Sequence, residues 1–123
     1  MTVLNGRKIF VVEDEPLILM ALEDMLEDMG CALAGSASNL ALGLQLAEAV
    51  DCEVAILDIN INGERSEPIA ALLAQRGIPC IYATGYGRAG IGAPADALVI
   101  EKPYSRDVLA RSITLAFAQT GKL

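Results

Sequence analysis

Four short apolar runs in this chain each lead into a charged or hydroxyl-bearing side chain, and this arrangement strongly limits the possible folds. Each run has the length and the aliphatic content of a strand that is buried on both faces of a parallel sheet. Because the carboxyl ends of parallel strands meet at one edge, we expect these polar side chains to gather in one pocket. The runs cover residues 9–12, 54–57, 78–83 and 97–100, and lead into Glu13-Asp14, Asp58, Thr84 and Glu101-Lys102.

Helical periodicity alternates with the apolar runs along the whole chain. This alternation predicts a flavodoxin-like α/β fold, a doubly wound five-stranded parallel sheet of order 2-1-3-4-5. We expect residues 1–123 to form a single domain without an output domain. Glycine recurs in residues 85–96, so we expect the fourth helix there to be short or irregular. The predicted strands are residues 8–12, 31–37, 54–59, 79–84 and 97–101, and the other predicted helices are residues 16–29, about 39–50, 66–75 and 105–119.

The composition excludes several classes of function. The chain has no histidine, which removes Ser-His-Asp and Cys-His catalysis and any His-ligated metal, while oxygen ligands and a hard cation remain possible. A net charge of −7, an absence of Trp and an aromatic content of 4% argue against nucleic acid as a partner. The sequence has no signal peptide pattern and no apolar run near the ~20 residues of a membrane span. We therefore expect a cytoplasmic protein, with its three cysteines as buried structural thiols.

The carboxylates at the predicted strand ends favour a magnesium-assisted phosphoryl acceptor. Glu13, Asp14 and Asp58 would repel one another unless a divalent cation lay among them. Magnesium binds carboxylate and carbonyl oxygens, so a backbone carbonyl near Asn60 is a further candidate ligand. Asp58 ends the central and most buried strand, which makes it the best candidate nucleophile. Lys102 and the Thr84 hydroxyl would then contact the transferring oxygens.

This constellation resembles the receiver domain of bacterial two-component response regulators over essentially the whole chain. The resemblance implies that Asp58 is the phosphoacceptor and that Glu13 and Asp14 organise magnesium. It also implies that Thr84 is the switch hydroxyl and Lys102 the phosphate-binding lysine. The phosphoryl donor would be a phosphohistidine on a sensor histidine kinase or a histidine phosphotransfer protein.

Three features depart from the usual receiver pattern. Val99 occupies the strand position that usually carries the aromatic switch residue. The loop after Asp58 lacks the common Met-Pro pair. The sequence separation between Thr84 and Lys102 is about four residues shorter than is usual in receivers. In these departures the chain resembles a subfamily of receivers that is named for its motif Phe-Ala-Thr-Gly-hydrophobic-Tyr. That subfamily is associated mostly with alphaproteobacteria and with HWE/HisKA-2 sensor kinases. Residues 82–87 and Lys102-Pro103-Tyr104 are close variants of its motifs.

The preferred interpretation is a stand-alone response regulator that signals by protein binding or serves as a phosphate relay or sink. Such a protein would catalyse only its own phosphotransfer and dephosphorylation and would have no other enzymatic activity. A pseudo-receiver that binds proteins without phosphorylation is the alternative. A haloacid-dehalogenase-type phosphatase is disfavoured because Asn60 stands where that class needs a second Asp. A flavodoxin-like cofactor carrier is disfavoured because no phosphate-binding loop follows the first strand.

Two surfaces are candidates for signalling. Residues 85–96 would become ordered on phosphorylation, and Tyr86 or Tyr104 would repack in place of the missing aromatic. The first predicted helix has an acidic face, and in receivers this helix and the loop before the last helix commonly meet the partner's helix pair. Leu17, Ile18 and Tyr104 would lie at that rim, while an ordinary amphipathic helix with a solvated face remains the alternative.

Overall fold

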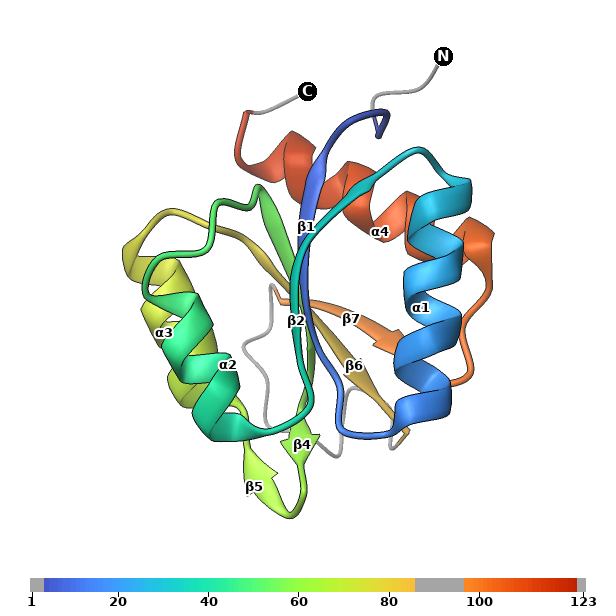
Figure 1. The fold of residues 1–123 in the computed structure, drawn as a ribbon. Coiled ribbons are helices and arrows are strands. Elements are labelled where there is room, and N and C mark those ends of the chain that lie inside the picture. Colours follow the sequence, from blue (N-terminus) through green and yellow to red (C-terminus); the bar gives the residue numbers. More distant parts are fainter. Residues whose placement is uncertain (1–3, 86–96, 122–123) are drawn as a thin grey trace.

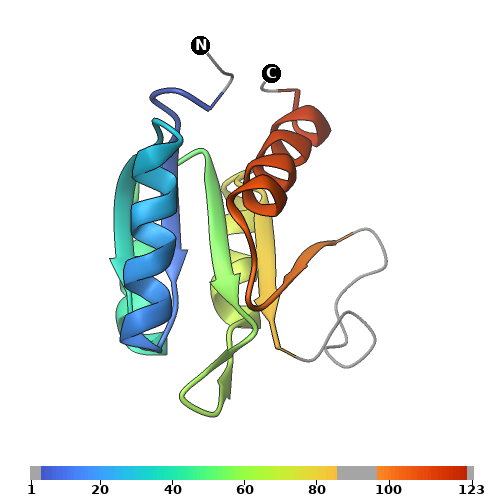
Figure 2. The same cartoon turned by 90° about the vertical axis from the view of Figure 1, so that its right-hand side faces the viewer.

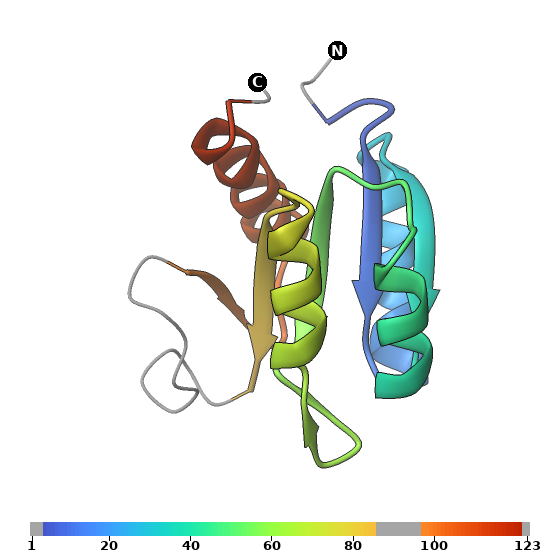
Figure 3. The ribbon, with the colours of Figure 1, turned by 90° about the vertical axis from the view of Figure 1, so that its left-hand side faces the viewer.

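The computed structural model describes residues 4–85 and 97–121, which form a parallel sheet covered by helices on both faces (Figure 1). Helices α1 and α4 cover one face, seen in Figure 2, and α2 and α3 cover the other, seen in Figure 3. The strands are β1 (Lys8–Val12), β2 (Ala32–Ala37), β3 (Val54–Asp58), β4 (Asn60–Ile61), β5 (Glu64–Arg65), β6 (Cys80–Thr84) and β7 (Leu98–Glu101). The helices are α1 (Pro16–Asp28), α2 (Leu40–Ala47), α3 (Glu67–Gln75) and α4 (Arg106–Gln119).

The order of the main sheet confirms the predicted topology. Its five strands run β2-β1-β3-β6-β7, all pairs are parallel, and β4 and β5 lie outside it. In sequence order this is the predicted 2-1-3-4-5 arrangement. Register places the strand ends side by side: Val12 pairs with Leu57, Asp58 with Ala83, and Thr84 with Glu101.

Two apolar layers hold the sheet between the helices. One layer joins Ile9, Val11 and Ile56 to Leu22 of α1 and to α4. The second layer is built from alternate residues of the same strands, together with α2 and α3. Strands β1 and β3 contribute to both layers because their successive side chains point to opposite faces. This double burial explains why these strands are continuous apolar runs in the sequence.

The helix starts agree closely with the sequence prediction. Asn39 caps α2, and its side chain accepts a hydrogen bond from the Leu42 N–H at 2.8 Å. The Ser105 hydroxyl caps α4 by accepting from the Val108 N–H at 3.2 Å. Pro16 lies in the first turn of α1, where its missing N–H costs nothing. The largest difference is at the end of α2, which ends at Ala47 whereas the pattern predicted a helix to about residue 50.

The short β4–β5 hairpin was not predicted. The sequence prediction continued the third strand to residue 59 and placed a loop after it. Instead β3 ends at Asp58, and Asn60 pairs with Arg65 in an antiparallel ladder. Asn62 and Gly63 form the turn with φ values of 53° and 84°. Asn-Gly between extended residues is a strong signal for such turns, because both residues tolerate positive φ. The hairpin extends beyond the carboxyl edge of the main sheet (Figure 3).

The structure bears in different ways on three further predictions, which concern the fourth helix, the cysteines and a membrane span. The short or irregular fourth helix was predicted within residues 85–96, and residues 86–96, which include Tyr86, lie outside the described residues. All three cysteines are free; Cys31 and Cys52 are buried, whereas Cys80 is only partly covered. None of the helices in the described part of the chain is long and apolar enough to cross a membrane.

Two residues of α4 test how much the core contributes to stability. Ile113 is fully buried, whereas Leu115 is 47% exposed on the same helix. We expect Ile113→Ala to lower the free energy of unfolding by about 2–5 kcal/mol, since it leaves a cavity in the core. Leu115→Ala should change it by no more than about 0.5 kcal/mol. Urea denaturation of both variants measures the difference, and equal losses would contradict this packing.

Candidate phosphoryl-acceptor site

The carboxyl ends of four parallel strands bring together the polar residues singled out in the sequence, except Glu101, which is exposed at the end of β7 and does not line the cavity described below. Glu13 and Asp14 directly follow β1, and Asp58 is the last residue of β3. Thr84 ends β6, and Lys102 follows the last residue of β7. The Lys102 N–H donates to the Thr84 carbonyl at 2.8 Å, which joins the last two strand ends. The predicted gathering at one sheet edge is therefore present.

Three carboxylates form the acidic part of the site. Glu13, Asp14 and Asp58 each offer one oxygen, and these oxygens all lie within 4.8 Å of one another. Glu13 is 2% exposed and Asp58 is 8% exposed, whereas Asp14 is half-buried. Like charges this close are unfavourable unless a cation compensates them.

Lys102 supplies a compensating cation from the chain itself. Its Nζ lies 2.7 Å from Glu13 Oε1 and 2.6 Å from Asp58 Oδ2, so one ammonium bridges two strand ends. Burial alone would lower the pKa of Lys102, but hydrogen bonds to Asp58 and Glu13 outweigh it, and the net shift is upward. The ammonium therefore stays charged at neutral pH. The peptide bond between Lys102 and Pro103 is cis.

The pKa values of Glu13 and Asp14 move in opposite directions. Burial raises the pKa of Glu13 to about 7, and the nearby charge of Asp58 adds to the rise despite the hydrogen bonds from Lys102 and the Glu15 N–H. Burial also raises the pKa of Asp14, but the hydrogen bond from the Asn62 N–H and neighbouring bonds outweigh it, so the net shift is downward. The cluster therefore places two carboxyl groups with different acidities side by side.

An open cavity of about 450 Å³ lies over Asp14 and Asp58, and Glu13 is not among the residues that line it. Asn60 contributes to its wall, and its N–H donates to Asp58 Oδ1 at 3.2 Å. Thr84 is buried at the end of β6 and does not line the cavity. Carboxylate oxygens and one ammonium around a small open space suit a hard cation and an anionic group together. The cavity is lined by Asp14, Glu15, Asp58, Asn60, Gly63, Gly85 and Lys102.

The sequence interpretation missed one contributor to the site. Asn62, at the tip of the hairpin, donates its backbone N–H to Asp14 Oδ2 at 2.9 Å. Its side-chain amide donates to the Ser38 carbonyl at 3.3 Å. The Asn62-Gly63 dipeptide was the available signal for the turn, but nothing in the sequence indicates that the turn reaches back to Asp14.

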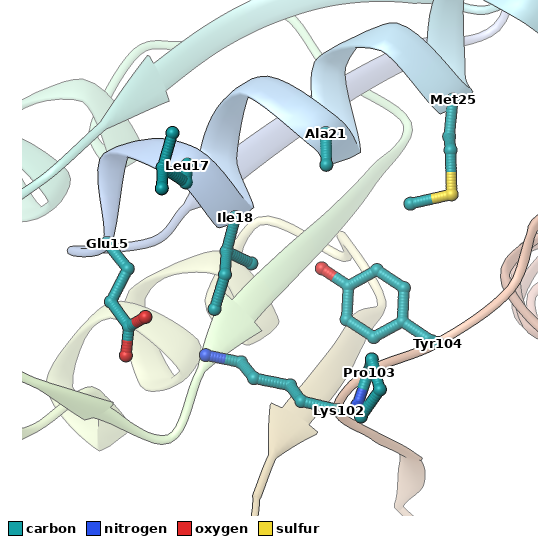
Figure 4. Close-up of a pocket in the computed structure, with 8 residues that line it drawn as sticks. All are labelled: Glu15, Leu17, Ile18, Ala21, Met25, Lys102, Pro103 and Tyr104. Carbon is teal, nitrogen blue, oxygen red and sulfur yellow. The ribbon is translucent and has the colours of Figure 1, made fainter.

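A second cavity of similar volume, the α1 groove, lies beside the first, between α1 and the segment that precedes α4 (Figure 4). Its walls are mainly apolar, and the Tyr104 ring faces α1 within it. The Tyr104 hydroxyl is buried without a hydrogen bond to any described residue. Burial raises the pKa of Tyr104 to about 12, so the hydroxyl stays protonated at neutral pH. The lining residues are Glu15, Leu17, Ile18, Ala21, Met25, Lys102, Pro103 and Tyr104.

The family model described as "Response regulator receiver domain" matches residues 9–114. The chain belongs to this family. That match covers the sheet, the acidic cluster and Lys102, so the predicted family and fold are confirmed. The narrower subfamily with the Phe-Ala-Thr-Gly motif stays a prediction.

Solved receivers have the same fold. SdrG from Sphingomonas melonis Fr1 is 37% identical, with a TM-score of 0.81 over 95% of this chain and 99% of that chain. The receiver domain of PhyR from Erythrobacter litoralis is 23% identical, with a TM-score of 0.81 over 95% of this chain and 94% of that chain. Among curated proteins, the transcriptional regulatory protein PdtaR of Mycobacterium tuberculosis is 28% identical over 119 residues, 92% of this chain. This receiver spans 58% of the length of PdtaR.

The pKa of Glu13 predicts an unusual contribution to stability in the absence of divalent cations. Its folded pKa of about 7 lies above the ordinary 4.5, so folding favours the protonated form. This contribution is fully present below pH 4.5 and is lost as the pH rises toward 7. We expect Glu13→Gln to remove that loss. Urea denaturation in EDTA between pH 4.5 and 7.5 measures the difference between wild type and variant, and a constant difference would contradict the raised pKa.

Proposed function

We propose that this receiver accepts a phosphoryl group from a phosphohistidine onto Asp58 in a magnesium-dependent reaction, and that it signals by protein binding or serves as a phosphate relay or sink. The observation that carries the proposal is the Lys102 ammonium between Glu13 and Asp58, at the wall of an open cavity. Such an arrangement offers a nucleophilic carboxylate, a cation for the incoming phosphoryl oxygens and neighbouring carboxylates for a metal.

The donor set fits magnesium. Glu13, Asp14 and Asp58 would hold the ion, with the backbone carbonyl of Asn60 as a further ligand. Magnesium, when bound, would neutralise the carboxylates and withdraw charge from the transferring phosphoryl group. Asp58 and Glu13 already share the Lys102 ammonium, so the site is built to compensate negative charge. Lys102 is then available to donate to a phosphoryl oxygen instead.

The transfer itself is a displacement at phosphorus. An oxygen of Asp58 forms the new P–O bond while the P–N bond of the phosphohistidine breaks, and the electron pair of that bond returns to the donor's imidazole. The product is an aspartyl phosphate beside Lys102. Thr84 lies at the neighbouring strand end, and we assign its hydroxyl to the phosphorylated state, where it would donate to a phosphoryl oxygen. Beyond this transfer and its hydrolysis we propose no enzymatic activity.

The α1 groove (Figure 4) supports a protein as the phosphoryl donor. It opens next to Lys102 and Glu15, and Leu17 is 79% exposed at its rim. A protein partner would bury this apolar surface while its phosphohistidine enters the neighbouring cavity. We propose a sensor histidine kinase, of the HWE/HisKA-2 class, or a histidine phosphotransfer protein, in the cytoplasm. Nucleic acid is not a proposed partner, given the net charge of −7.

One observation favours a second candidate function. Lys102 pairs with Glu13 and Asp58 at 2.7 and 2.6 Å, so the acidic cluster is partly neutralised without a metal. A pseudo-receiver that binds proteins through its surfaces and is never phosphorylated would need such internal compensation. Its downstream partner would then recognise a single conformation.

Intact mass spectrometry after incubation with a small-molecule phosphodonor tests phosphorylation directly. Wild type should gain one phosphoryl group with magnesium and none in EDTA. Asp58→Asn should gain none, because the amide is a poor nucleophile. Glu101→Gln, at the exposed end of β7, is the matched control and should behave as wild type. If neither small donors nor a panel of histidine kinases phosphorylate folded protein that binds magnesium, the pseudo-receiver is the better interpretation.

A protein donor at the α1 groove makes a separate prediction. Leu17→Glu should slow transfer from a phosphorylated kinase or phosphotransfer protein by at least about tenfold, because it places a charge in an apolar contact. Transfer from a small phosphodonor should not change, since Leu17 is exposed and does not line the carboxylate cavity. Leu115→Glu on α4, also exposed, is the control. Equal rates for both variants with a protein donor would place docking elsewhere.

A further inference from the structure

We propose that Asn62 is a positioning residue for the metal site, acting through Asp14. The proposal rests on the magnesium-dependent function above, and it gives the β4–β5 hairpin a role in that function. The hairpin extends beyond the sheet edge, yet Asn62 at its tip joins two other segments of the chain. Those segments are the loop after β1, through Asp14, and the loop after β2, through Ser38.

The first connection is from backbone to carboxylate. The Asn62 N–H donates to Asp14 Oδ2 at 2.9 Å, across 48 residues of sequence. Asp14 is only half-buried, so without this donor its carboxyl group could rotate toward solvent. Hydrogen bonds from neighbouring groups commonly orient the ligands of a metal and strengthen its binding. The N–H of Asn62 is such a donor for Asp14.

The second connection keeps this N–H in place. The Asn62 side-chain amide donates to the Ser38 carbonyl at 3.3 Å, just before α2 begins. The backbone of Asn62 has φ 53°, a left-handed conformation that Asn adopts more readily than most residues. Asn therefore meets two requirements at once: it tolerates the turn, and its amide reaches the neighbouring loop.

The hairpin also contacts two carboxylates of the site, those of Asp58 and Asp14. Asn60, at the start of β4, donates its N–H to Asp58 Oδ1 at 3.2 Å, whereas Asn62 donates to Asp14. Two backbone N–H groups of one hairpin thus orient two carboxylates, one at the end of β3 and one in the loop after β1. The β4–β5 ladder keeps these two donors at a fixed spacing, because Asn60 pairs with Arg65 and Ile61 pairs with Glu64. Ile61 is fully buried and anchors the hairpin in the core.

Magnesium affinity, measured by isothermal titration calorimetry, tests the proposal independently of phosphorylation. Asn62→Val should bind magnesium about tenfold more weakly, because a β-branched residue disfavours φ 53° and lacks the amide. Asn62→Gly keeps the left-handed turn, so its affinity should fall between those of Asn62→Val and wild type. Glu64→Gln, an exposed hairpin residue outside the cavity, is the control and should bind as wild type at physiological salt. Wild-type affinity in Asn62→Val would overturn the proposal.

Amide hydrogen exchange separates this proposal from the function on which it rests. In metal-free protein the Asn62 N–H should be protected, and Asp14→Ala should remove most of that protection while leaving the β3 amides unchanged. An unprotected Asn62 N–H in wild type would overturn the connection to Asp14. If the N–H is protected as expected but wild type binds no magnesium, then the proposed phosphoryl-acceptor function fails and the hairpin's role in metal binding fails with it.

Discussion

Repulsion among three carboxylates at the edge of the sheet is the constraint on which the site depends. Glu13, Asp14 and Asp58 lie within 4.8 Å of one another, and two of them are almost fully buried. Such a cluster is tolerable only with compensating charge, which Lys102 supplies to Glu13 and Asp58. Asp14 receives an N–H from the hairpin instead. The cost of bringing the carboxylates together favours a cation in the cavity, and that cation can be the Lys102 ammonium or a metal ion.

The fold positions this cluster through strand register. Because β1, β3, β6 and β7 are parallel and adjacent in the order β1-β3-β6-β7, their carboxyl ends meet at one edge. Their apolar segments pack into two layers against four helices, so the strand ends are held by the most buried part of the molecule. A rigid core therefore supports a polar edge, and the loops after the strands can carry chemistry without being part of the core.

The α1 groove and the carboxylate cavity share Lys102 and Glu15. A partner in the groove would therefore contact the same lysine that compensates the acidic cluster. Tyr104 lines the groove with a buried hydroxyl that has no hydrogen bond among the described residues. Burial is the main cause of its raised pKa, and the charges of Glu13 and Asp58 add to the rise. The proposed docking and the proposed phosphoryl transfer would thus take place side by side on the receiver, which suits a partner that delivers a phosphohistidine.

The sequence alone predicted the five strands, their order and the polar residue at each strand end, because continuous apolar runs report burial on both faces of a parallel sheet. It also predicted where α2 and α4 begin, since their caps, Asn39 and Ser105, act locally. The β4–β5 hairpin and its contact with Asp14 were decided only by tertiary structure. That hydrogen bond joins residues 48 positions apart, and no local pattern encodes such a distance. The partition of Lys102 between Glu13 and Asp58 depends likewise on how three strand ends pack together.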